Sequence, residues 1–387
     1  MLRFLSALIL SAWSAAASAT PVSEMRLVGD MQRTRFVIDL AGKPDVGVIR
    51  LTNPYRLVID MPNVEFGPPK PGKGRGLVTD FRYGLIAPGK ARIVLDLNGP
   101  ADVVKTFVLD AVGTEPARLV FDIAPTSAEA FAAAALKDRP AATPATAEAA
   151  PAPGPQATRG TVVVIDPGHG GIDSGARGAD GLLEKDVTLT FAAELARRLN
   201  SHGKVQAVLT READSFLPLR SRIDVAREHQ AALFISIHAD TVNEKYVRGA
   251  TVYTVSDKAS DTLSAALAAR ENRSDILAGF ALDDQPQDVA DILFDLARRE
   301  TKNLSVRFAQ SLVTDLDGTL PLNKSPWRRA AFVVLKAPDT PSVLLELGYL
   351  SNGDDEKLFR APNWQVKSAE TVAAAIEEFV GTNVAGQ

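Results

Sequence analysis

Two of the four histidines follow apolar runs that are typical of buried strands. His169 comes directly after VVVIDPG, and His238 ends the run LFISIH. The carboxyl ends of parallel strands meet at one edge of a sheet, so we expect the two imidazoles to lie close together. Neutral imidazole binds first-row divalent metals, and a third ligand from an Asp or Glu would leave one position open for water. The pattern therefore indicates a metal site that activates water.

A glycine-rich loop surrounds the first of these histidines. Its five glycines would let the backbone turn tightly around an ion, and they are Gly168, Gly170, Gly171, Gly175 and Gly178. Such a loop after a strand is also typical of phosphate binding, but neither G-x-G-x-x-G nor G-x-x-x-x-G-K-[ST] occurs in the chain, so we favour the metal. The other histidines, His202 and His229, lie at ends of predicted helices and are interpreted as surface or packing residues.

Two glutamates are candidates for the remaining chemistry. Glu346 lies in the apolar run SVLLEL, where an unpaired carboxylate is costly to bury, and a carboxylate placed there could take up the proton of a water molecule. The alternative for Glu346 is an ion pair that caps the strand. Glu184 precedes a predicted helix in LLEKDVTL and, from the residues alone, is equally an ordinary first-turn acid favoured by the helix dipole.

From residue 161 onward, apolar β-branched runs alternate with helical stretches. The expected strands are VVVID, VQAVLT, ALFISIH, GATVYTV, AFVVLK and SVLLEL, and the expected helices span 187–200, 219–230, 301–316 and 365–380. This alternation predicts a C-terminal α/β domain of three layers, in which helices cover both faces of a largely parallel sheet.

One pattern occurs four times nearer the N-terminus: RFVIDL from Arg35, RLVIDM from Arg56, RIVLDL from Arg92 and RLVFDI from Arg118. In a strand, the second, fourth and sixth residues would form an apolar stripe, whereas Arg, Val and Asp would share the opposite face. Neighbouring strands are then expected to pair Arg with Asp. Because turn formers separate the copies, we expect an all-β, sandwich-like domain over 20–124. Taken one at a time, the Arg and Asp residues are interpreted as charged side chains that solvate one face of the sheet. For the domain as a whole, we favour a non-catalytic binding module.

The net charge, the N-terminal segment and the composition of the chain indicate where the protein is located and which partners it is expected to have. A net charge of −4 offers no bulk attraction for nucleic acid, so we expect no nucleic-acid partner. Residues 1–19 combine Arg3, an apolar run and the motif ASA at 17–19, which predicts a signal peptide and export to the periplasm. No later apolar run is long enough for a transmembrane anchor. Residues 125–160, rich in Ala and Pro, are predicted to be a linker, whose first part, 127–138, is compatible with a short helix.

Four motifs, in order, carry a resemblance to a known family. VVVIDPGHGGIDSGARG, LLEKDVTL, FLPLRSRIDVAREHQAALFISIHAD and APDTPSVLLELGYLSN resemble the zinc-dependent N-acetylmuramoyl-L-alanine amidases of bacterial cell-wall turnover. The resemblance implies a catalytic domain over 161–384 with His169, Glu184 and His238 as Zn²⁺ ligands and Glu346 as the catalytic residue. The substrate it implies is peptidoglycan, cleaved between muramic acid and L-alanine.

The N-terminal repeat, placed ahead of a Pro-rich linker, resembles the AMIN domain, a targeting module of such amidases. Two other functions remain open. One is a degenerate peptidoglycan-binding regulator that keeps the fold without the reaction, and the other is a metal-dependent hydrolase of a different amide or ester. The ligand types alone also leave manganese and cobalt open in place of zinc.

An insert over about 256–300 separates GATVYTV from the helix expected at 301. Its residues Leu263, Ala266, Leu267 and Arg270 share one helical face, which predicts a partly amphipathic helix. The resemblance to amidases of daughter-cell separation implies that a helix here blocks the site with a glutamate until an activator protein, of degenerate LytM type, docks. Glu271 is the expected glutamate and Asp275 the alternative, and Glu271 is otherwise an ordinary solvated helical residue.

Overall fold

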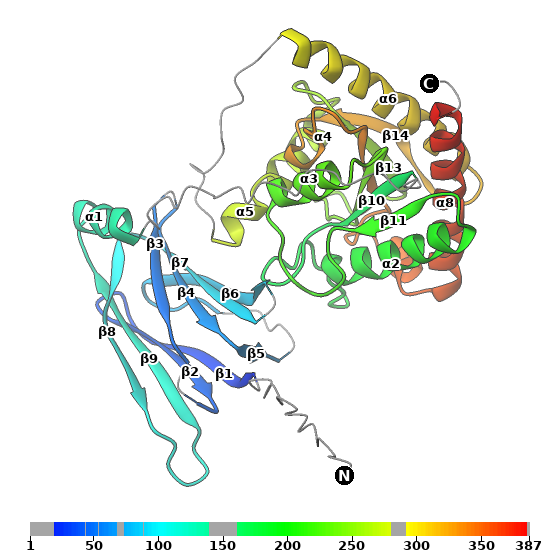
Figure 1. The fold of residues 1–387 in the computed structure, drawn as a ribbon. Coiled ribbons are helices and arrows are strands. Elements are labelled where there is room, and N and C mark those ends of the chain that lie inside the picture. The colour runs from blue at the N-terminus through cyan, green and yellow to red at the C-terminus, as the bar shows by residue number, and fades with distance from the viewer. Residues whose placement is uncertain are drawn as a thin grey trace, which may run out of the picture.

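The computed structural model describes residues 19–42, 44–52, 54–67, 73–87, 89–138, 161–279 and 292–384. Nearly all of the expected signal peptide and the Pro-rich part of the expected linker lie outside the described residues. Figure 1 shows an all-β body, drawn in blue and cyan, beside an α/β body drawn from green to red. The predicted fold class, an N-terminal all-β region followed by an α/β region, is confirmed.

The β body consists of two sheets that pack face to face. The first has the strand order β5 (Val64–Phe66), β1 (Thr20–Gly29), β2 (Thr34–Leu40), β9 (Ala117–Pro125) and β8 (Ala101–Leu109). The second has the order β3 (Gly47–Leu51), β4 (Arg56–Pro62), β7 (Lys90–Leu97) and β6 (Val78–Ala87). Within the two sheets, only the β1–β5 pair is parallel in the described residues.

The four repeat copies form β2, β4, β7 and β9, none of which is an edge strand. Their apolar stripes meet between the sheets, where residues such as Phe36 and Ile93 are fully buried. The predicted cross-strand pairing is also present. The Nε of Arg35 donates to Asp122 over 2.6 Å, and the Nε of Arg92 donates to Asp60 over 2.6 Å.

Helix α1 (Ala128–Asp138) lies in the stretch expected to be linker and packs against the β body. Phe131 is fully buried, and its ring meets that of Tyr55 edge-on at 5.3 Å between centroids. At the end of the helix, Asp138 accepts a hydrogen bond of 2.8 Å from Nη1 of Arg50 on β3. The expected short helix is thus present and is held by apolar packing and an ion pair.

The α/β body is built on one sheet of order β11 (Gln206–Leu209), β10 (Val162–Pro167), β12 (Leu233–His238), β15 (Ser342–Glu346), β13 (Ala250–Val255) and β14 (Leu322–Ala330). All neighbours run parallel except β13 and β15. The expectation of a strand at AFVVLK is wrong, because Val333–Leu335 forms a 3₁₀ turn. Strand β14, by contrast, was not expected.

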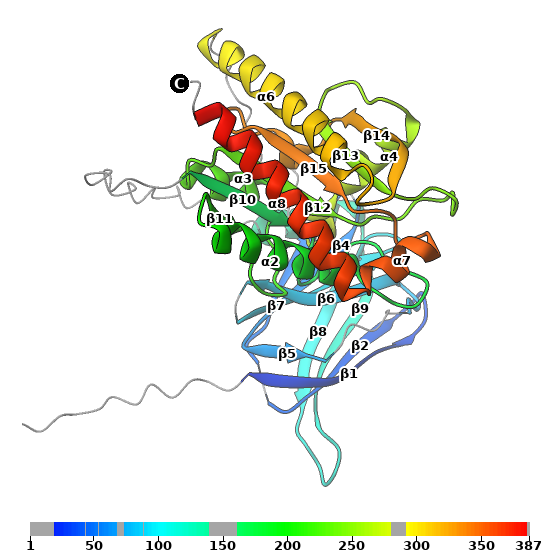
Figure 2. The same ribbon diagram turned by 90° about the vertical axis from the view of Figure 1, so that its right-hand side faces the viewer.

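Helices cover both faces of this sheet (Figure 2). One face packs against α2 (Glu184–His202), α6 (Ile292–Leu316) and α8 (Pro362–Val384). The other packs against α3 (Leu219–Glu228), α4 (Thr262–Glu271) and the 3₁₀ turn. Two short helices, α5 (Ser274–Leu277) and α7 (Gly353–Phe359), complete the body. Among the described residues, none of the helices has the length and apolarity that a membrane span requires.

Candidate active site

Three of the predicted site residues lie at neighbouring strand ends. His169 follows β10, His238 ends β12, and Glu346 ends β15 beside its register partner His238. The rings of His169 and His238 have their centroids 5.0 Å apart. The sheet therefore brings the two imidazoles and the carboxylate to one edge, as their positions in the apolar runs predicted.

The loop that carries His169 has an unusual backbone. His169 has a φ of 60°, in the left-handed region. Arg222 of α3 holds this loop by donating hydrogen bonds of 2.8 Å to the carbonyls of Pro167 and His169. The loop also passes so close to the second histidine that a Cβ on Gly168 would lie 2.5 Å from Cε1 of His238. Glycine at this position is thus required by space.

Glu184, the first residue of α2, is fully buried and faces both imidazoles. Its Oε2 lies 3.1 Å from Nε2 of His169, and its Oε1 lies 3.1 Å from Nδ1 of His238. The backbone amides of Ala176 and Ala239 donate to the same carboxylate over 2.8 and 2.9 Å. These two amides fix the carboxylate between the rings.

The insert contributes a further carboxylate to this cluster. Glu271 ends α4 and is 5% exposed, and its Oε2 lies 3.4 Å from Nε2 of His169 and from Nδ1 of His238. Ligand atoms of these three residues all lie within 4.8 Å of one another. Asp275, the alternative, faces elsewhere, because its Oδ1 accepts a hydrogen bond from the amide of Leu219. Only about 10 Å³ of free space remains beside the cluster.

Helix α4 is anchored at both ends. Asp261 caps its start by accepting a hydrogen bond of 2.8 Å from the amide of Ser264. Just past its end, the side chain of Asn272 donates to the carbonyl of Ala331 and accepts from the amide of Val333. Arg270, one residue before Glu271, forms an ion pair with Asp240. These contacts hold Glu271 against the histidines.

Glu346 has one oxygen that is held by a hydrogen bond and one that is not. Its Oε2 accepts a hydrogen bond of 3.1 Å from the amide of Asp240, whereas its buried Oε1 has no hydrogen-bond partner in the described part of the chain. Burial, with the nearby Asp240 and Glu184 carboxylates, raises the pKa of Glu346 well above its ordinary value. Burial likewise raises the pKa of Asp240 to about 7. The site thus holds a carboxyl group suited to carrying a proton.

The donor set fits a divalent metal. Nε2 of His169 is buried without a hydrogen-bond partner among the described residues, although two carboxylates lie within 3.4 Å of it. A ring nitrogen in that setting is satisfied by a cation. Two imidazoles with carboxylate oxygens are the ligands that zinc takes in hydrolytic sites, so the residues fit this ion.

Sequence reasoning missed the supporting residues. Asp173 accepts from Nδ1 of His169 over 2.9 Å, the contact that orients a metal-binding imidazole. Arg222 and Asp240 were also missed, although all three lie inside the motifs that carry the resemblance. As interpreted, His202 and His229 lie away from this cluster: His202 pairs with Glu377 over 2.7 Å, and His229 caps α3.

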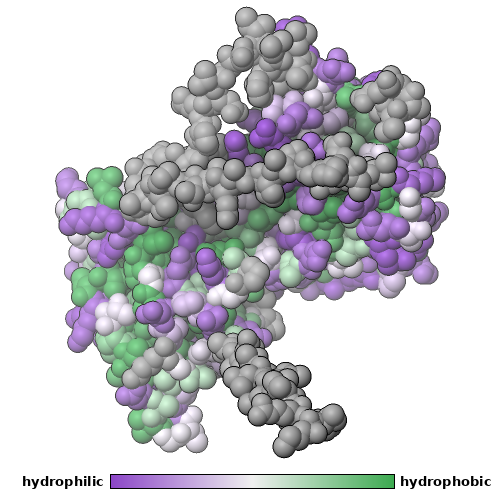
Figure 3. Space-filling model, viewed as in Figure 1, coloured by the Kyte–Doolittle hydropathy of each residue, from purple (hydrophilic) through white to green (hydrophobic). Residues whose placement is uncertain are grey.

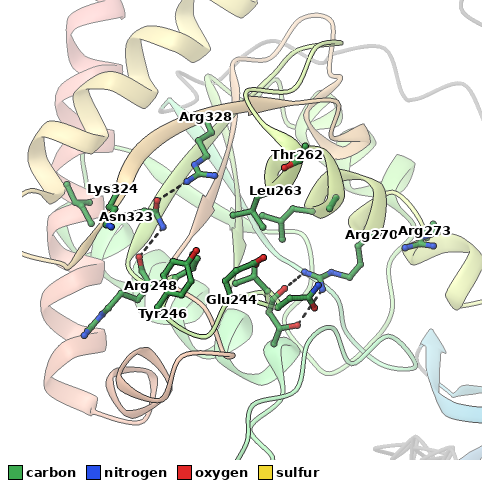
Figure 4. Close-up of a pocket in the computed structure, with 17 residues that line it drawn as sticks. Glu244, Tyr246, Arg248, Thr262, Leu263, Arg270, Arg273, Asn323, Lys324 and Arg328 are labelled. Carbon is green, nitrogen blue, oxygen red and sulfur yellow. Dashed lines mark hydrogen bonds between the residues drawn. The ribbon is translucent and has the colours of Figure 1, made fainter.

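A groove of about 1,070 Å³ runs beside the site along α4. Figure 4 shows that it is lined by α4, by the segment that follows β12 and by β14. Most of the charged side chains in its lining are cationic, and they are Arg248, Arg270, Arg273, Lys324 and Arg328. Arg270 lies where the groove meets the cluster of histidines and carboxylates, next to Glu271.

A histidine and carboxylate cluster at the carboxyl edge of a parallel sheet is typical of metal-dependent hydrolases with an α/β fold. Residues 163–378 match the N-acetylmuramoyl-L-alanine amidase family, and residues 24–123 match the AMIN domain. The chain belongs to the N-acetylmuramoyl-L-alanine amidase family. The resemblance and the enzyme class inferred from the motifs are confirmed.

Named relatives agree with this assignment. The chain is 30% identical to N-acetylmuramoyl-L-alanine amidase AmiC of Escherichia coli O6:H1 over 379 residues, which cover 94% of this chain and 90% of that protein. It is 38% identical to N-acetylmuramoyl-L-alanine amidase AmiA of Escherichia coli K12 over 216 residues, which cover 56% and 74% of the two chains. Among solved structures, N-acetylmuramoyl-L-alanine amidase AmiC2 of Nostoc punctiforme is 31% identical and covers 57% of this chain and 97% of that one, with a TM-score of 0.41.

Proposed function

We propose that this protein is a zinc-dependent amidase of the periplasm, which hydrolyses the amide bond between N-acetylmuramic acid and L-alanine in peptidoglycan. The proposal rests on the convergence of His169, Glu184 and His238 with Glu346 at one edge of the sheet. Membership of the amidase family supports the substrate and the bond. The reaction would serve remodelling of the cell wall and splitting of the septum during division.

In this proposal His169, Glu184 and His238 hold zinc, which when bound polarises the amide carbonyl and lowers the pKa of a water molecule. Glu346 accepts the proton of the attacking water on its free Oε1 and passes it to the departing nitrogen of L-alanine. The amide of Asp240 keeps the other oxygen of Glu346 in place. Asp173 fixes the ring of His169 through Nδ1, so that Nε2 would be the nitrogen that binds the metal.

The proposal includes autoinhibition by α4. With His169, Glu184 and His238 as three ligands, Glu271 would supply a fourth and take the position that water needs. Its 3.4 Å approach to both histidines and the small space left beside them support this role. An activator protein of the division machinery, of degenerate LytM type, would draw α4 away and open the site.

The β body would direct the enzyme to the cell wall. Among the described residues, large exposed apolar side chains are concentrated on this body, at Val28, Met31, Val104, Leu109 and Val112. Figure 3 shows hydrophobic residues spread over its surface, and Figure 1 shows the β8–β9 hairpin projecting away from the α/β body. The larger number of exposed apolar side chains on this body supports a binding role.

The experiment uses purified protein, zinc and dye-labelled peptidoglycan. We expect little dye release by the wild type and a strong rise in Glu271→Ala, with zinc retained in both. Adding Glu346→Gln to Glu271→Ala should lower the rate of dye release by at least about 100-fold, since general acid–base catalysis contributes about 10²–10⁴-fold. Glu378→Gln, at an exposed position of α8, is the matched control and should change nothing.

Mass spectrometry of the digest identifies the bond. Free stem peptides that begin with L-alanine support the amidase, whereas fragments still joined to muramic acid would indicate a hydrolase of another bond. No release by any variant, with zinc bound, would favour a non-catalytic regulator. Activity of Glu271→Ala that is insensitive to Glu346→Gln would refute the mechanism.

A further inference from the structure

The insert contacts the β body just after the residue that faces the histidines. Nη1 of Arg56 donates a hydrogen bond to the carbonyl of Ile276, and Nη1 of Arg92 donates to the carbonyls of Ala278 and Gly279 over 3.2 and 3.3 Å. These carbonyls lie at the end of α5, and that of Ile276 also accepts a hydrogen bond of 3.0 Å from the amide of Gly279. Figure 1 shows α5 at the junction of the two bodies.

Apolar packing accompanies these hydrogen bonds. Val58 and Val94, the outward-facing valines of two repeat copies, are fully buried in a cluster with Ala278 of the insert and with Ile172 and Phe216 of the α/β body. The approach is close enough that a Cβ on Gly279 would lie 2.9 Å from Val58. The φ of Gly279 is 80°, so this position also favours glycine by its backbone conformation.

The same sheet is fixed to the frame of the active site. The carbonyl of Leu85 on β6 accepts hydrogen bonds from the amides of Ile172 and Phe216 over 3.3 and 3.2 Å. Ile172 lies in the glycine-rich loop, next to Asp173, which orients His169. One sheet therefore touches both the loop that carries a histidine and the segment that follows Glu271.

The arginine at the centre of this contact is expensive to bury without its partner. Arg56 is 3% exposed, and burial lowers its pKa to about 10. Its register partner Asp96 is paired with Arg82 over 2.5 Å, and the hydrogen bonds of Arg56 in the described chain go to the carbonyls of Pro54 and Ile276. The carbonyl of the insert therefore satisfies a buried guanidinium that has no carboxylate of its own.

We propose that the outer face of the β3–β4–β7–β6 sheet is a docking surface for the insert segment 274–279, and that the β body thereby holds α4 closed over the active site. The inference rests on the proposed function, because it assigns the hold on α4 to a part of the chain outside the catalytic body. Opening of α4 then requires the segment to leave Arg56 and Arg92. The β body therefore restrains the activity of the α/β body, in addition to directing the enzyme to the cell wall.

The test replaces both docking arginines, as Arg56→Gln with Arg92→Gln, in the full chain. The repeat supplies the matched control, Arg35→Gln with Arg118→Gln, at the equivalent positions of β2 and β9 in the other sheet. Loss of hydrogen bonds from charged donors should shift the docking equilibrium about tenfold or more. We expect amide hydrogen exchange over 262–279, and basal hydrolysis of peptidoglycan, to rise by about that factor in the docking variant but not in the control.

A second variant, Gly279→Val, perturbs the same contact from the insert and leaves the β body unchanged. It should give the same increase in exchange, because its side chain would collide with Val58. Exchange within twofold of the wild type in both variants would overturn the inference, as would an equal rise in the Arg35 and Arg118 control. If Glu271→Ala released no hydrolysis, the proposed function would fail, and hydrogen exchange would still decide whether the segment docks.

Discussion

Replacement of the buried Arg222 should strongly lower the stability of the α/β body. It is 2% exposed, and its Nη1 donates to Oδ1 of Asp166 over 2.8 Å. Its other hydrogen bonds hold the carbonyls of Leu217, Pro167 and His169. Replacing it in Arg222→Met keeps apolar volume but leaves Asp166, which is 1% exposed, without its ion-pair partner.

The expected cost follows from this burial. Breaking a buried ion pair by removing one partner destabilises a protein by about 3–5 kcal/mol. For a domain of about 150–250 residues each kcal/mol lowers Tm by about 2–4 °C, so the transition should fall by about 6–20 °C. The control Arg220→Met lies on the same helix, where Arg220 is half exposed and 3.8 Å from Asp224. Its cost should stay below about 1 kcal/mol.

Tryptophan fluorescence isolates the relevant unfolding transition. Of the three tryptophans, Trp327 and Trp364 lie in the α/β body and Trp13 in the expected signal peptide. A chain that starts at Thr20 therefore reports only the α/β body during unfolding in urea. A cost below about 1 kcal/mol for Arg222→Met, at an unchanged slope, would refute the reasoning.

The same variant makes a prediction about pH. Burial alone would raise the pKa of Asp166, but Arg222, Thr210 and Ser236 together hold it below its ordinary value. A carboxyl whose folded pKa is lower than its unfolded pKa contributes stability above about pH 4 and loses it as the pH falls through the folded value. Without Arg222 the folded pKa rises. The difference in unfolding free energy between wild type and Arg222→Met should therefore shrink as the pH falls from 7 towards about 4.

The remaining predictions concern the metal and the location of the enzyme. His169→Ala and His238→Ala should each release zinc in metal analysis, because each removes one of the two imidazole ligands, and full retention in both would contradict the assignment. Asp173→Asn should keep the fold but lower zinc affinity about 10–100-fold in a chelator competition, since it weakens the contact with Nδ1 of His169. A fluorescent fusion of residues 20–124 should concentrate on the cell wall at division sites, and a diffuse periplasmic signal would count against targeting.

The sequence predicted the positions of His169, His238 and Glu346 well for a physical reason. Each follows or ends a short apolar run, and such runs become central strands of a parallel sheet because both faces are covered by helices. The carboxyl ends of such strands lie at one edge of the sheet, so residues that end neighbouring strands are expected to lie close together. Glu184 had no such signal. Its burial depends on how the start of α2 packs beneath the glycine-rich loop, and the local sequence does not reveal this tertiary packing.

Two elements were not predicted correctly from the sequence, for opposite reasons. AFVVLK is apolar enough for a strand, but Phe332, Val334 and Leu335 satisfy that apolarity by packing a 3₁₀ turn on the sheet face. An apolar run predicts burial more securely than it predicts a strand. Strand β14 is the reverse case, since LNKSPWRRA is polar and contains Pro326. It forms an edge strand, where proline and half-exposed polar residues are tolerated.

The repeat shows that a sequence pattern does not predict the partner of each side chain. Its four copies predict the same strand, the same buried stripe and the same outward Arg and Asp, and all four have these features. Their outward arginines nevertheless have different partners, because the neighbouring strands differ. Arg35 pairs with Asp122, whereas Arg82 on β6 occupies Asp96 and leaves Arg56 to reach the carbonyl of Ile276. The partner of each repeat arginine thus depends on residues outside the repeat, such as Arg82 on β6, which the pattern does not contain.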